Sequence, residues 1–302
     1  MATLSRTRFL PFALLALSQG AVAACPLGPD VDFDGVCDDI DSCPAVFNPN
    51  QGFAFGAIEV VAPAPGIAFS VFATDLDGDG DADVLSASYN GNSISWHENV
   101  GGGSFAAAQI ISTVTDGATS VYAADLDGDG DADVLSASYR DDKVAWYRNL
   151  GGGSFGAQQI ITTAANGAKS VFAIDLDGDG DADVLSASFN EVAWFENTGF
   201  GNFGNSRRIG TVSDGEEVYA TDLDGDGDVD VLSASSGDNT VSWYENLGGG
   251  LFGAHVIATV SGPRSVFATD LDGDGDADLI SASFEGVAGY ENLGATIRSS
   301  TM

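Results

Sequence analysis

The sequence has few basic residues, few histidines and cysteines, and no long apolar segment beyond its start. Its 302 residues include 10 Lys and Arg against 45 Asp and Glu, which gives a formal charge of −35. So few cations cannot neutralise a run of phosphates, and anionic membrane surfaces would repel the chain, so neither nucleic acid nor a membrane surface is an expected partner. Two His and three Cys are too few for zinc fingers or for most nucleophilic catalysis. No apolar segment reaches the length of a transmembrane helix.

Apolar residues, in contrast, are present in normal proportion. Hydrophobic residues make up 44% of the chain, with 18 Phe, 7 Tyr and 4 Trp. A disordered acidic tail contains few such residues, so the chain can fold around a large core. Helical periodicity of useful length is missing, whereas short runs of alternating apolar and polar residues, punctuated by Gly, Asn and Asp, predict β-strands throughout.

The first 24 residues have the pattern of a secretory signal peptide. Arg6 and Arg8 precede an apolar stretch over 9–17, and small residues follow at 21–24. We therefore expect a mature protein that is secreted or displayed at the cell surface. The alternative is a bacterial lipoprotein signal ending at Cys25, which would then carry a lipid anchor.

An eleven-residue motif, Val-(Phe/Tyr)-Ala-x-Asp-Leu-Asp-Gly-Asp-Gly-Asp, occurs five times along the chain. The copies begin at Val71, Val121, Val171, Val218 and Val266. A spacing of 47 to 50 residues is typical of propeller blades rather than helical solenoids. Each repeat predicts four short strands. In the second repeat these are expected over 120–125, 133–138, 143–149 and 155–162.

The order of the fourth strands predicts how the ring closes. Their Phe-Gly or Phe-Ala signature appears at Phe55, Phe105, Phe155, Phe203 and Phe252, so one copy precedes the first repeat and none follows the last. We expect residues 53–61 to complete the blade that begins at Val266, because this pairing removes two exposed sheet edges. The alternatives are an open arc and a larger ring shared with another chain.

The fold prediction is thus all-β. It is a β-propeller of five four-stranded blades closed by an N-terminal strand and preceded by a small calcium-binding segment. The predicted organisation is a signal peptide (1–24), a calcium-binding segment (25–51), the propeller (52–294) and a C-terminal tail (295–302).

Each repeat contains an acidic loop with Asp at positions 1, 3, 5, 7 and 9 and Gly at positions 4 and 6. A hairpin turn needs only one Asp and one Gly, whereas five neighbouring carboxylates repel one another unless a cation lies among them. Alternating oxygen donors with Gly at position 6 match the requirements of calcium better than the strict octahedron of magnesium. The predicted ligands are Asp75, Asp77, Asp79, Asp81 and Asp83; Asp125, Asp127, Asp129, Asp131 and Asp133; Asp175, Asp177, Asp179, Asp181 and Asp183; Asp222, Asp224, Asp226, Asp228 and Asp230; and Asp270, Asp272, Asp274, Asp276 and Asp278.

The Phe-Gly-Ala strand followed by Asp-x-Asp-Gly-Asp-Gly-x-x-Asp resembles the FG-GAP/VCBS repeat of integrin α-subunit propellers and of many secreted microbial proteins. The resemblance covers residues 53–294. It implies a propeller in which the side chains at loop positions 1, 3, 5 and 9 and the backbone carbonyl at position 7 bind calcium, about five ions in all. Propellers of this family usually have seven blades, whereas this sequence contains five repeats.

A second acidic segment precedes the repeats. Residues 30–38 show the same acid spacing, and Asp41 follows at position 12. The segment is similar to a single thrombospondin type 3 repeat, which implies one further calcium ion and a disulfide. The predicted ligands are Asp30, Asp32, Asp34, Val36 (through its carbonyl), Asp38 and Asp41. Cys25 pairs with Cys37, or Cys37 with Cys43 if Cys25 is lipidated, and the odd count leaves both open.

Three further residue types repeat or stand alone. Trp96, Trp146, Trp194 and Trp243 occupy one place in the third strand, where packing between blades is favoured over an aromatic sugar platform. His97 and His255 are read as packing or surface residues. Glutamates two places after this position recur in four of the five repeats, including the fifth, which has Gly289 in place of tryptophan. Their recurrence favours a structural role over a catalytic pair: Glu98, Glu196, Glu245 and Glu291.

These features predict a binding or adhesion module without catalytic activity, whose partner is an extracellular protein or glycan. The alternative is a multivalent lectin with one weak glycan site per blade. A glycan hydrolase or lyase on a propeller scaffold is less favoured, because the repeats look too uniform to supply one asymmetric site.

Overall fold

The described part of the chain consists of β-strands joined by turns. The computed structural model describes residue 61 and residues 66–294, which belong to one compact unit beginning at Val60. These residues form 19 strands and no helix, and hence no helix that could span a membrane. The strands of the first three sheets are β1 (Ala68–Thr74), β2 (Asp83–Ser88), β3 (Ser93–His97), β4 (Gln109–Ser112), β5 (Ala118–Ala124), β6 (Asp133–Ser138), β7 (Lys143–Tyr147), β8 (Gln159–Thr162), β9 (Ser170–Ile174), β10 (Asp183–Ala187), β11 (Glu191–Phe195) and β12 (Arg207–Thr211). Those of the last two are β13 (Gly215–Thr221), β14 (Asp230–Ser235), β15 (Thr240–Asn246), β16 (Phe252–Thr259), β17 (Ser265–Thr269), β18 (Asp278–Ser283) and β19 (Gly286–Tyr290).

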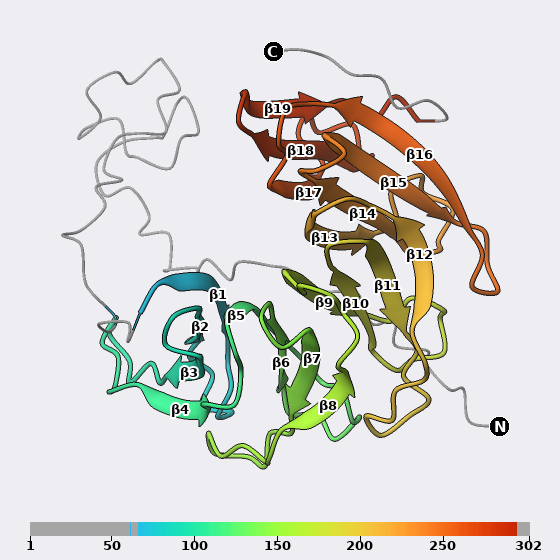
Figure 1. Ribbon diagram of the computed structural model, residues 1–302. Helices are drawn as coiled ribbons and strands as arrows, with labels where there is room; N and C mark the ends of the chain where they lie inside the picture. Colours follow the sequence, from blue (N-terminus) through green and yellow to red (C-terminus); the bar gives the residue numbers. More distant parts are fainter. Residues whose placement is uncertain (1–60, 62–65, 295–302) are drawn as a thin grey trace, which may run out of the picture. The chain divides into compact units, whose positions relative to one another are not determined.

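The strands form five antiparallel sheets that follow one another along the chain (Figure 1). Four sheets contain four strands, and the last contains the three strands β17, β18 and β19. The five predicted repeats are therefore confirmed as five sheets, and the fourth strand of the last sheet is not found in residues 66–294. In the second repeat the fourth strand is shorter than predicted, because Phe155 makes only an isolated bridge to Asn149 before β8 begins.

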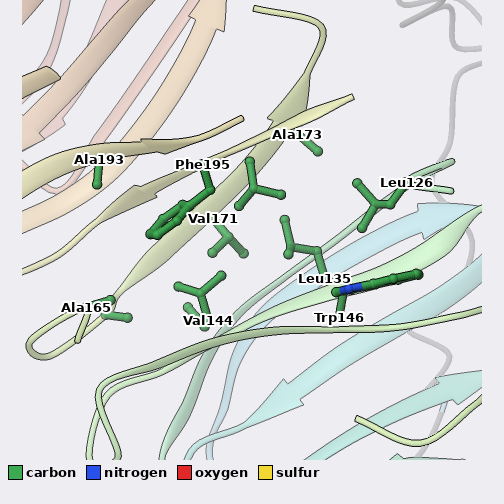
Figure 2. Packing of buried hydrophobic residues seen from close by; sticks show 12 residues of the cluster. Leu126, Leu135, Val144, Trp146, Ala165, Val171, Ala173, Ala193 and Phe195 are labelled. Carbon is green, nitrogen blue, oxygen red and sulfur yellow. The ribbon is translucent and has the colours of Figure 1, made fainter. Parts of the chain in front are cut away.

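Apolar side chains pack between consecutive sheets. The first strands lie next to one another in the order β1, β5, β9, β13 and β17. Because successive strand residues point to opposite faces, each inner sheet packs on both of its neighbours. Figure 2 shows one of these interfaces, in which Leu135, Val144 and Trp146 of the second sheet face Val171 and Phe195 of the third.

Three of the four tryptophans are buried between neighbouring sheets. Trp96, Trp146 and Trp194 are at most 3% exposed. The Trp146 ring covers Gly201 of the next sheet, where a Cβ atom would lie only 2.4 Å from the ring. Packing between blades is thus confirmed for these three, and a sugar platform is excluded for them because their faces are covered. Trp243 is partly exposed and stacks on His255, with the ring centroids 4.8 Å apart.

The first and last sheets each leave an apolar face uncovered. Val71 of β1 is 68% exposed, whereas the corresponding valines of the other repeats are 2–4% exposed. At the other end, Val287 of β19 is 78% exposed, against 0% for Ile94, Val144 and the other equivalent residues. Neither a closed sheet nor packing of β17 on β1 comparable to that between the other first strands is found in residues 66–294. The predicted closing strand (53–61) lies, except for Val61, outside the described residues.

Candidate metal centres

Each acidic loop connects the first strand of a sheet to the second. In the first sheet, Asp75 follows the last residue of β1 and Asp83 is the first residue of β2. Gly78 and Gly80, at positions 4 and 6, have φ angles of +83° and +94°. Side chains disfavour this conformation, which explains the glycines at these two places. The same pair of positive φ angles recurs in all five loops.

Backbone N–H groups hold the first and last carboxylates of each loop. The Oδ1 and Oδ2 atoms of Asp75 accept hydrogen bonds from the amides of Gly78 (2.7 Å) and Gly80 (2.9 Å). The buried Asp83 accepts one from Leu76 (3.0 Å) and one from Asn99 (2.7 Å). Equivalent bonds occur in the other four loops, so the loop conformation is fixed by the chain itself.

The asparagine that recurs at the end of the third strand, or just after it, connects adjacent loops. In the second sheet, the Asn149 side chain donates to the carbonyl of Leu76 in the preceding loop at 2.8 Å. Asn197, Asn246 and Asn292 make the same bond to the loop before them. The recurrence of this asparagine is therefore explained by contacts between neighbouring repeats.

Carboxylates at loop positions 1, 3 and 9 converge in every repeat. One oxygen atom from each of the three lies within 4.8 Å of the other two. The five triads are Asp75, Asp77 and Asp83; Asp125, Asp127 and Asp133; Asp175, Asp177 and Asp183; Asp222, Asp224 and Asp230; and Asp270, Asp272 and Asp278. Three hard oxygen donors around one point are the chemistry that calcium and magnesium accept.

Positions 5 and 7 of the loops are not part of these triads. Asp79, at position 5, accepts a hydrogen bond from the amide of Asp81 at 2.9 Å. The same arrangement holds for Asp129 and Asp131, Asp179 and Asp181, Asp226 and Asp228, and Asp274 and Asp276. The predicted ligands of the N-terminal segment and the three cysteines all lie outside the described residues.

Burial makes the ninth carboxylate of the second, third and fourth loops unusually basic. It raises the pKa of Asp133 and of Asp230 to about 6 and that of Asp183 to about 7, against the lowering effect of their backbone hydrogen bonds. A buried carboxylate without a cation favours its neutral form, and a divalent cation beside it would restore the charged form.

These shifts predict that the metal-free protein becomes more stable as the pH falls. The three aspartates bind protons more tightly in the folded state than in the unfolded chain, where their pKa is about 4. Their contribution to the free energy of unfolding should therefore grow between about pH 7 and pH 4. Burial lowers the pKa of His97. This one group acts in the opposite direction, because its contribution to the free energy of unfolding falls as the pH falls.

Melting curves in chelator at pH 8 and pH 5 test this expectation. We expect the higher melting temperature at pH 5. In saturating calcium the order should reverse, because protons and calcium compete for the same carboxylates. A metal-free protein that loses stability steadily below pH 7 would contradict the assignment of protonated aspartates.

The second loop differs from the others through Arg148. The other four repeats have a glutamate at this place. The Arg148 guanidinium contacts Asp127 (Nε–Oδ2, 2.7 Å) and Asp129 (Nη2–Oδ2, 2.9 Å). Asp127 belongs to the second triad, so an arginine already neutralises part of the charge that a cation would meet there.

Replacing Arg148 should therefore strengthen cation binding at the second loop. We expect Arg148→Glu to lower the calcium Kd of this loop roughly tenfold, since charge-assisted hydrogen bonds contribute about 1.5–3 kcal/mol. The reverse change in the first repeat, Glu98→Arg, is the matched control and should weaken the first loop. Calorimetric calcium titrations check both variants, and unchanged affinities would show that Arg148 does not influence the ion.

The structure also contains a pocket that the sequence analysis missed. It lies at the opposite end of the first strands from the acidic loops and brings together Lys169, Glu216, Glu217 and Arg264. The uniform repeats of the sequence predict no asymmetric site, whereas the charged residues of this pocket come from only three of the five repeats. The signal was the residue two places before the recurring valine, which differs in every repeat: Phe69, Thr119, Lys169, Glu216 and Arg264.

Comparison with known structures supports the fold. A lectin of Agrocybe aegerita, described for its specific recognition of non-reducing terminal N-acetylglucosamine, superposes with a TM-score of 0.55 at 24% identity. The match covers 76% of this chain and 65% of the lectin, less than two thirds of its length. A protein of unknown function from Desulfotomaculum acetoxidans gives a TM-score of 0.56 at 14% identity, over 80% of this chain and 71% of the other. At such identities the likeness concerns the fold alone.

Comparison at the level of sequence identifies the repeats. A search of curated proteins finds no significant match. The model of the FG-GAP-like repeat matches four overlapping segments, 75–136, 125–186, 175–233 and 222–281. Each match begins at the first aspartate of an acidic loop and extends into the second strand of the next sheet. The matched segments together cover more than half of the sequence, and the chain therefore belongs to the FG-GAP-like repeat family.

Proposed function

We propose that the chain is an exported, calcium-stabilised propeller that serves as a binding or adhesion module without catalytic activity. The observation that carries the proposal is the presence of five matching aspartate triads, each built into the same place of a repeated sheet. A bound calcium ion would neutralise the three carboxylates and fix the loop that joins the first two strands. The signal-like residues 1–24 support a secreted or cell-surface location, with an extracellular protein or glycan as partner.

The contacts of two recurring glutamates support a role in structure rather than catalysis. Glu196 pairs with Arg207, and Glu245 lies 3.1 Å from His255. Each pair joins neighbouring strands of one sheet, where the register sets Trp194 opposite Arg207 and Trp243 opposite His255. Paired carboxylates for glycoside hydrolysis would instead face each other across a cleft.

Calcium-dependent retention on an extracellular ligand tests the proposal. The purified protein should bind a component of immobilised matrix glycans or matrix proteins in millimolar calcium, and chelator should release it. Retention of neither class in calcium would contradict a binding function. A multivalent lectin would additionally give signals on a glycan array that grow with ligand density, whereas silence in saturating calcium would rule against it.

Closure of the ring by residues 53–61 is part of the proposal. The uncovered faces of β1 and β19 support it, because exposed apolar sheet faces and open edges favour aggregation and need a covering element. Deleting residues 53–61 should yield an oligomeric or insoluble protein. Deleting residues 25–50 should leave it soluble and monomeric. Size-exclusion chromatography compares the two, and identical behaviour would contradict closure by this strand.

A further inference from the structure

The pocket at the end of the first strands is lined by a position that differs in every repeat. Its volume is about 400 Å³, and residues of all five repeats line it. That volume lies within the range of small-molecule sites. The acidic loops are at the other end of the same strands, so the pocket is separate from the candidate metal centres.

Three serine hydroxyl groups supply hydrogen-bond donors to the pocket. Ser70, Ser120 and Ser170 line it, and each Oγ accepts a bond of 3.3 Å from a backbone amide of the next sheet. This hydrogen bond fixes the position of each serine oxygen. No acceptor for the three hydroxyl hydrogens occurs within residues 66–294, so these hydrogens can be donated to a ligand.

A charged cluster supplies a hydrogen-bond acceptor to the pocket. The Oε1 atom of Glu216 accepts hydrogen bonds from Lys169 (3.0 Å), from Ser236 (2.7 Å) and from Arg264. Its Oε2 atom has no partner in the part of the chain that the structure describes, and so remains an acceptor. Two cations and two acids, Glu216 and Glu217, line the pocket, which makes its formal charge zero.

An aromatic face completes the pocket. Phe69 is 57% exposed and stacks by one side on Tyr89, with centroids 4.8 Å apart and planes at 30°. Phe69 also lines the pocket, so part of its exposed surface is available to a ligand there. An aromatic face beside fixed donors and an acceptor matches a sugar ring, which has apolar C–H faces and a rim of hydroxyl groups.

We propose that this pocket binds one neutral sugar unit, a single site in place of one site per repeat. The inference rests on the proposed binding function and names its ligand class. A fatty ligand would leave the charged groups without partners, at a large cost in desolvation. An anionic sugar would approach a chain of formal charge −35 and meet a pocket without excess positive charge.

Titration of neutral glycosides against pocket variants tests the proposal. The probes are the methyl glycosides of glucose, galactose, mannose, N-acetylglucosamine and N-acetylgalactosamine, measured by saturation-transfer NMR and calorimetry in millimolar calcium. We expect at least one to bind. Phe69→Ala should weaken it roughly tenfold or more, and Phe69→Trp should retain it because the aromatic face remains.

Phe200→Ala is the matched control. Phe200 is 85% exposed, does not line the pocket, and lies beside Gly199, which approaches Asp181 of an acidic loop. This variant should bind neutral glycosides with the affinity of the unmodified protein.

Binding of glucuronic acid or glucosamine but of no neutral glycoside would overturn the proposal, as would equal affinities of the Phe69→Ala and Phe200→Ala variants. Retention of the Phe69→Ala variant on matrix ligands would show that the binding function stands and that this pocket does not carry it.

Discussion

Removing calcium from the purified protein is expected to lower its melting temperature sharply. A ligand that binds only the folded state adds about RT ln(1 + [L]/Kd) per site to the free energy of unfolding. Five loops, each occupied at some tens of times its Kd, would contribute on the order of 10 kcal/mol. Without the ion, the converging carboxylates of each triad repel one another and Asp83, Asp133 and their equivalents are buried without a cation.

Calorimetry or circular dichroism with chelator and with millimolar calcium measures this loss. Calcium added back should restore the melting temperature, whereas magnesium should restore it poorly, because magnesium demands octahedral geometry and retains its waters. Melting curves that coincide with and without calcium would show that the loops are turns and not metal sites.

The second large effect is expected from Trp146→Ala. Trp146 is 3% exposed and fills the space above Gly201, which has no side chain that could replace it. Truncating a buried aromatic residue costs about 3–5 kcal/mol, because the cavity collapses only partly. For a unit of this size the melting temperature should fall on the order of 10 °C.

Trp243→Ala provides the comparison for this variant. Trp243 occupies the same place in its sheet, but it is partly exposed and stacks on His255. Its replacement should lower the free energy of unfolding by less than half as much as Trp146→Ala does, since less apolar surface returns to water. Denaturant unfolding in calcium checks both variants. Equal losses in the free energy of unfolding would contradict a special stabilising role of the tryptophans that are buried between sheets.

The repeats made the sheets and the loops predictable from sequence. A motif that recurs five times reports one local structure five times, so the strand order of each sheet and the place of the aspartates followed from it. Packing of Trp146 between blades was also expected, because the same large side chain recurs at one strand position. All five aspartates of each loop were predicted as ligands; the carboxylates at positions 1, 3 and 9 converge, whereas those at positions 5 and 7 lie outside the triads, and their role as ligands stays a prediction.

The pocket was hidden because it depends on how repeats far apart in the sequence meet. Lys169 and Glu216 are 47 residues apart and belong to different sheets, yet their side chains lie 3.0 Å from each other. The contact of Arg148 with Asp127 and Asp129 was missed for a similar reason. The replacement of glutamate by arginine is visible in the sequence. That the arginine side chain reaches the acidic loop depends on the pairing of strands, which the sequence does not show.

The number of calcium ions bound per chain is the most direct test of calcium binding by the acidic loops. Calorimetric titration of the mature protein should give about five sites from the loops and one more from residues 30–41. The variant Asp175→Asn/Asp177→Asn removes two ligands of the third loop and leaves the buried Asp183 in place, so it should bind one ion fewer and keep its fold. Fewer than one ion per chain, or an unchanged number in this variant, would contradict the proposal that the aspartate triads are calcium sites.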